Sequence, residues 1–108
     1  MSTLADVTDA SFTDDVRNAH DTVLVEFWAE WCPPCRALTP ALEALAAEEH
    51  PNFRIVKINS DENPRTAAEF GVLAIPTMKV FRNGEVVKTI VGAKPTAALR
   101  FDLANYIG

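Results

Sequence analysis

The two cysteines of this 108-residue chain lie close together, in the run Trp31-Cys32-Pro33-Pro34-Cys35. A pair at this spacing can bind zinc, form a structural cross-link or exchange disulfides with a substrate. Zinc needs about four ligands, and only His20 and His50 remain, with no paired ligand spacing around either. A structural disulfide closing so small a ring stabilises little, because the entropic gain grows with loop length. The spacing therefore favours redox exchange and no metal.

The residues around the cysteines predict a strand followed directly by a helix. The run Val23 to Trp28 is apolar on both faces except for Glu26, which is typical of a central strand covered by helices on both sides. If the helix begins at Pro33, Cys32 is its N-cap, and the first-turn amides and the helix dipole favour the Cys32 thiolate. Because the thiolate is the attacking form, Cys32 is the expected nucleophile and the more shielded Cys35 the resolving cysteine.

The rest of the chain predicts a mixed sheet between helices, in a single domain over residues 1–108. The expected strands are Leu4 to Val7, Val23 to Trp28, Phe53 to Asn59, Thr77 to Phe81 and Val86 to Val91. The expected helices are a short one capped by Ser11, Pro33 to about Glu49, Pro64 to Phe70, and about Pro95 to Tyr106. Asn83-Gly84 between the last two strands predicts an antiparallel hairpin.

The composition is that of a globular protein that binds neither membranes nor nucleic acids. No apolar run approaches the roughly 20 residues of a membrane helix. The net charge of −5 disfavours a nucleic-acid partner, because phosphate binding needs a basic face. The acidic N-terminal segment lacks the basic and apolar regions of a secretory signal, so we expect a cytosolic protein.

The run EFWAEWCPPC resembles the active site of the thioredoxin family, and matching features continue across essentially the whole chain. They are Pro40, Lys57, Asp61 with Asn63-Pro64, Phe70-Gly71-Val72, Ile75-Pro76-Thr77, Asn83-Gly84 and Val91-Gly92. The resemblance implies the thioredoxin fold, an α/β fold with a central mixed five-stranded sheet flanked by four helices. It also implies a monomeric reductase of disulfide-containing client proteins. Such a protein binds no cofactor itself and receives electrons from NADPH through a flavoenzyme, thioredoxin reductase.

Two positions depart from the family pattern. Pro33 stands where the family usually has glycine, and Glu26 stands where it usually has a buried aspartate. Pro33 and Pro34 fit the expected turn, because amides in the first turn of a helix have no partner inside it. Both departures bear on reactivity more than on the fold.

The resemblance assigns Glu26 to proton transfer with Cys35. A lone carboxyl group in a buried strand should have a raised pKa. The alternative is that this face of the strand is partly open and Glu26 is solvated. Lys57, alone among apolar residues in its strand, is the expected partner that modulates Glu26. The alternative for Lys57 is a surface lysine whose stem lies along the protein.

The resemblance also implies a substrate groove beside the disulfide. It predicts a cis bond between Ile75 and Pro76, with the Ile75 backbone offering hydrogen bonds to an extended client. Trp31, next to the nucleophile, and Gly92, where bulk would block the groove, would complete this surface.

Three further residues are expected to support the site. Trp28 should pack beneath the turn with its indole N–H directed to Asp61. Pro40, inside the long helix, removes a backbone hydrogen bond and should bend that helix.

Two other functions stay open at this point. One is an oxidase or isomerase of an oxidising compartment, which the missing signal and the absence of a histidine before Cys35 disfavour. The other is a binding module of the same fold without turnover, which the intact cysteine pair disfavours.

Overall fold

The structure, a computed structural model, describes residues 2–107. In this part of the chain five strands and four helices follow the order predicted from the sequence. The strands are β1 (Ala5–Val7), β2 (Thr22–Trp28), β3 (Phe53–Asn59), β4 (Thr77–Arg82) and β5 (Glu85–Val91). The helices are a π-helical turn, η1 (Thr13–Arg17), and three α-helices, α1 (Pro33–Ala46), α2 (Pro64–Glu69) and α3 (Thr96–Ile107).

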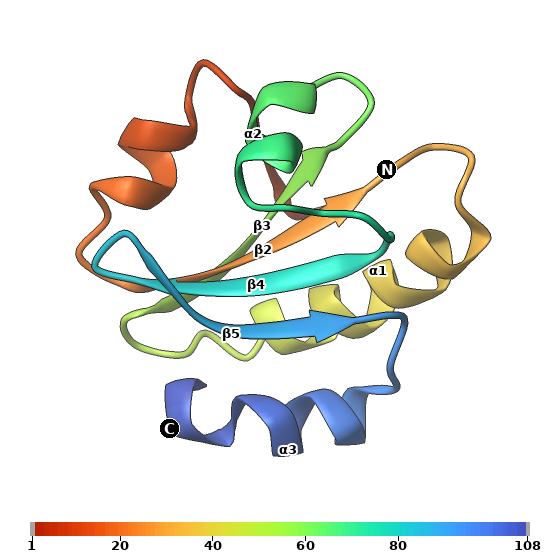
Figure 1. Cartoon of the computed structure of the whole chain (residues 1–108). Coiled ribbons are helices and arrows are strands. Elements are labelled where there is room, and N and C mark those ends of the chain that lie inside the picture. Colours follow the sequence, from red (N-terminus) through yellow and green to blue (C-terminus); the bar gives the residue numbers. More distant parts are fainter. Residues whose placement is uncertain (1, 108) are drawn as a thin grey trace.

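The strands form a mixed sheet in the order β1-β3-β2-β4-β5, with β2 at its centre (Figure 1). β3 runs parallel to β1 and β2, whereas β4 is antiparallel to β2 and β5. Asn83 and Gly84 turn the β4–β5 hairpin with φ values of 53° and 79°, the left-handed conformations that such a two-residue turn requires. The predicted fold class is therefore confirmed.

Helices cover both faces of the sheet (Figure 1). α1 and α3 pack on one face through leucines spaced three or four residues apart, namely Leu38, Leu42, Leu45, Leu99 and Leu103. η1 and α2 lie on the other face, where Phe12 and Phe70 contact Phe81. Because both faces are covered, every residue of β2 before Trp28 is buried. Among residues 2–107, no helix has the length and apolar character needed to cross a bilayer.

The two helices nearest the N-terminus differ from the expectation. Ser11 does not cap the first one with its side chain, because its hydroxyl accepts a hydrogen bond from the Thr8 amide at 2.9 Å. The long helix ends at Ala46 and not at Glu49, since Glu49 has a φ of 54°, which cannot continue a right-handed helix.

Candidate active site

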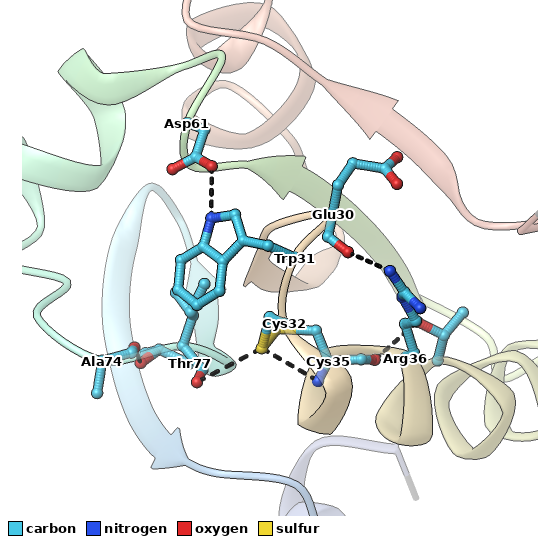
Figure 2. The surroundings of a disulfide bond; sticks show 10 residues. Glu30, Trp31, Cys32, Cys35, Arg36, Asp61, Ala74 and Thr77 are labelled. Carbon is cyan, nitrogen blue, oxygen red and sulfur yellow. Dashed lines mark hydrogen bonds between the residues drawn. A yellow bond between two sulfur atoms is a disulfide. The ribbon is translucent and has the colours of Figure 1, made fainter.

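Cys32 and Cys35 form a disulfide at the N-terminus of α1, with their Cα atoms 5.3 Å apart (Figure 2). Cys32 is the N-cap, with extended backbone, and Cys35 lies in the first turn, as the sequence predicted. The Cys35 amide donates a hydrogen bond to Cys32 Sγ at 3.3 Å. Pro33 and Pro34 begin the helix and have no N–H to donate. The helix therefore directs one amide of its first turn at the sulfur of Cys32.

The loop before β4 faces the Cys32 sulfur. Its Ile75–Pro76 peptide bond is cis, as the resemblance implied. The Ile75 carbonyl oxygen lies 3.8 Å from Cys32 Sγ, and the Pro76 carbonyl accepts a hydrogen bond from the Gly92 amide at 2.8 Å. The structure thus links Ile75, Pro76 and Gly92 to the disulfide. Their role in binding clients stays a prediction.

Trp31 lies on the open rim of the site, with 65% of its surface exposed. Its Nε1 donates a hydrogen bond of 2.7 Å to Asp61 Oδ2 (Figure 2). The assignment of this bond to Trp28 is wrong, because Trp28 Nε1 is buried without a hydrogen-bond partner among the described residues. Trp28 is still part of β2 and lies beneath the Lys57 ammonium. Trp31 belongs to the turn, which approaches the loop that carries Asp61.

Glu26 is fully buried in β2, at 0% exposure. Neither of its carboxyl oxygens has a hydrogen-bond partner in the described part of the chain. Burial raises the pKa of Glu26 from 4.5 to about 7, and the Lys57 ammonium acts in the opposite direction. The prediction of a buried glutamate with a raised pKa is confirmed, and the solvated alternative is wrong.

Lys57 stands opposite Glu26 in the register of β2 and β3. Only 13% of its side chain is exposed, so it is not an ordinary surface lysine. Its Nζ pairs with Asp6 Oδ1 at 3.3 Å and lies 4.6 Å from the centre of the Trp28 ring. Sequence reasoning missed Asp6, because the register of a three-residue strand cannot be inferred from its composition.

A surface cleft of about 550 Å³ runs beside these groups and is lined by Cys35, Trp28, Lys57 and Asp6, among others. Its lining includes several residues of α1, so the cleft lies on the α1 side of the sheet, and Cys35 and Lys57 both line it. In the part of the chain that the structure describes, no group of three or more potential ligand side chains is placed to hold a metal ion.

Comparisons with known proteins agree with this geometry. The thioredoxin family model matches residues 3–105. A thioredoxin of Streptomyces clavuligerus is 57% identical over 96 residues, which cover 89% of each chain. The chain belongs to the thioredoxin family. A thioredoxin of Porphyra purpurea is 47% identical over 104 residues, or 96% of this chain and 97% of that one.

A longer member of the thioredoxin family carries a second activity. The bifunctional thioredoxin reductase/thioredoxin of Mycobacterium leprae is 48% identical over 102 residues, which cover 94% of this chain and 22% of that protein.

Family membership and the disulfide together establish the reaction. The chain is a thiol-disulfide oxidoreductase of the thioredoxin family, a protein-disulfide reductase whose redox centre is the Cys32–Cys35 pair.

Proposed function

We propose that this chain reduces client disulfides as a monomer, with Cys32 as the attacking thiolate and Cys35 as the resolving thiol. The observation that carries the proposal is the unequal placement of the two sulfurs. Cys32 is the N-cap of α1, beside the Ile75 carbonyl, whereas Cys35 follows within the helix and lines the cleft on the Lys57 side. The thiolate is stabilised at the N-cap, where the helix dipole is positive.

The cycle begins when the Cys32 thiolate attacks one sulfur of a client disulfide and expels the other client sulfur as a thiolate. Cys35 then loses its proton to Glu26, and its thiolate attacks the Cys32 sulfur of the mixed disulfide. The second client thiolate leaves, and the Cys32–Cys35 disulfide remains. Each cycle transfers two electrons to the client. Glu26 suits this step because its pKa, raised by burial to about 7, lets it accept a proton near neutral pH.

The groove for the client is formed by Trp31, Ile75, Pro76 and Gly92. Its support is the path of contacts from Cys32 Sγ to the Ile75 carbonyl and on through Pro76 to Gly92. An extended client segment would bind by backbone hydrogen bonds along this path, which suits clients of varied sequence.

Electrons return to the disulfide from NADPH through a thioredoxin reductase, a flavoenzyme, and the chain itself binds no cofactor. The support is the Mycobacterium leprae relative, whose name joins the two activities in one polypeptide. We place the cycle in the cytosol, where thiols are kept reduced.

Trapping experiments test the assignment of the two cysteines. Reduced Cys35→Ser should accumulate a mixed disulfide with insulin, visible by non-reducing electrophoresis and mass spectrometry, because the resolving thiol is missing. Cys32→Ser should trap almost none. Equal trapping by the two variants would contradict the assignment. NADPH oxidation in the presence of a thioredoxin reductase and insulin tests the electron source.

A further inference from the structure

Three charged residues form a row across three neighbouring strands on the α1 face of the sheet. Asp6 of β1 is in register with Lys57 of β3, which is in register with Glu26 of β2. Exposure falls along the row, from 69% for the Asp6 side chain to 13% for that of Lys57 and 0% for Glu26. The row therefore leads from solvent to the buried acid.

Lys57 stands between two carboxyl groups and forms its ion pair with the outer one. Its Nζ lies 3.3 Å from Asp6 Oδ1, and Trp28 holds it from one side. Within the described residues, Glu26 receives no hydrogen bond from Lys57 or from any other group. The cation that would stabilise an ionised Glu26 is thus paired with the outer carboxylate, and it acts on Glu26 without a hydrogen bond.

We propose that Asp6 is a positioning residue of the exchange reaction, because by holding the Lys57 ammonium away from Glu26 it keeps Glu26 basic enough to take the Cys35 proton. This inference rests on the role given to Glu26 under the proposed function. Asp6 touches neither cysteine and acts through Lys57.

Two effects of removing the Asp6 charge have the same sign. The Lys57 ammonium becomes free to turn toward Glu26, and a negative charge near Glu26 disappears. Both favour the ionised form of Glu26, so its pKa should fall. Burial, which raises that pKa to about 7, is unchanged.

Asp6→Asn does not alter the other charged or titratable groups on this side of the sheet. Those that line the cleft with Cys35 are Glu30, Arg36 and Glu43. On the β4 side, the residue in register with Glu26 is the uncharged Met78. A change in the titration of Glu26 can therefore be assigned to the row.

The experiment compares Asp6→Asn, which removes the charge and keeps the shape, with two controls. Asp6→Glu keeps the charge, and Asp14→Asn removes an exposed carboxylate from η1, on the opposite face of the sheet. Two quantities are measured against pH. They are the midpoint of the Glu26 carboxyl carbon signal by NMR, and the rate of mixed-disulfide resolution by stopped-flow fluorescence.

In Asp6→Asn both midpoints should move down together, by about one pH unit, while both controls keep the wild-type values. Lys57→Met should move the Glu26 midpoint up, and adding Asp6→Asn to it should lower that midpoint by much less than Asp6→Asn does alone, because only the direct effect of the Asp6 charge is then lost. An unmoved Glu26 midpoint in Asp6→Asn would overturn the inference. So would an equal shift of the Glu26 midpoint by Asp6→Asn with and without Lys57, or an NMR midpoint that moves while the pH dependence of the resolution rate does not.

Trapping by Cys35→Ser is independent of this row, so it still tests the proposed function if the inference fails.

Discussion

Two opposing effects act on the carboxyl group of Glu26. Burial disfavours the charged form, and the Lys57 ammonium favours it. Burial is the larger effect, because no hydrogen bond reaches either carboxyl oxygen among the described residues and Lys57 forms its ion pair with Asp6. The pKa therefore lies near 7, where a group can accept a thiol proton at neutral pH.

The raised pKa of Glu26 predicts a pH-dependent stability. The folded protein holds this proton more tightly than the unfolded chain, so stability should fall as pH rises from about 4.5 to 7 and then level off. The loss should be roughly 3 kcal/mol, from about 1.4 kcal/mol per pKa unit. Glu26→Gln cannot ionise, so it should lack this loss and be more stable than wild type at pH 8. Urea unfolding of the oxidised protein between pH 4.5 and 8 measures the difference.

A matched control for this experiment is Glu62→Gln, which removes an exposed carboxylate. Its stability curve should follow that of the wild type. If the curves of Glu26→Gln and wild type run parallel across the whole range, Glu26 does not carry the raised pKa.

Single residues differed in how far the sequence revealed them. Glu26 could be predicted because it is one polar residue within an apolar strand. The partner of Asp61 could not, because two tryptophans lie three positions apart and only the end of β2 decides which indole faces the loop. Asp6 was missed because its importance depends on the register of β1 with β3.

At the scale of elements, the β4–β5 hairpin depends on close contact with η1. Gly84 has a φ of 79°, and a Cβ built there would lie 2.9 Å from the Arg17 carbonyl oxygen. Gly71, after α2, also has a positive φ, 63°, but open space around it. Replacing each glycine by alanine therefore separates the stability cost of backbone strain from that of steric contact.

Gly71→Ala should cost about 1 kcal/mol of stability, because only the left-handed backbone is strained. Gly84→Ala should cost at least about 1 kcal/mol more, since the backbone of Arg17 must also move. Urea unfolding with unchanged m-values measures both costs. Equal losses in the two variants would mean that the hairpin does not press on η1.

Most elements could be predicted from local patterns, and the errors have local causes. Apolar runs located β2 and β3, and Asn83-Gly84 located the hairpin. The end of α1 was missed because the sequence from Ala44 to Glu49 has no glycine to end a helix. The cap of the first helix was missed because Ser11 bonds backward to Thr8.

At the scale of the whole molecule, the sheet topology assembles the site. β2 and β3 are parallel neighbours, so the loops after their carboxyl ends meet at one edge of the sheet. One loop carries Trp31 and the cysteines, and the other carries Asp61, which explains their hydrogen bond. Because β4 is antiparallel to both β2 and β5, the hairpin adds the loop with the cis bond and Gly92 to the same edge.

The reduction potential also belongs to the whole molecule, since it compares the free energies of its oxidised and reduced states. Pro33 should keep the potential low. It has no N–H to stabilise the Cys32 thiolate, for which the Cys35 amide is the donor in the first turn. It also restricts the reduced chain, so closing the disulfide loses less entropy. Both effects lower the reduction potential. Strain in a small ring that contains two prolines opposes them, because it raises the potential.

We expect the missing N–H and the restricted reduced chain together to outweigh ring strain. The potential should then lie nearer the thioredoxin value of about −270 mV than the isomerase value of about −180 mV. Pro33→Gly should raise it by about 20 mV, since roughly 30 mV corresponds to 1.4 kcal/mol. Pro33→Ala restores the N–H with less added backbone freedom, so its potential separates the two effects. Equilibration with glutathione gives the reduction potentials of the wild type and the two variants. A wild-type value near that of the isomerase, or a lower potential in Pro33→Gly, would show that ring strain dominates.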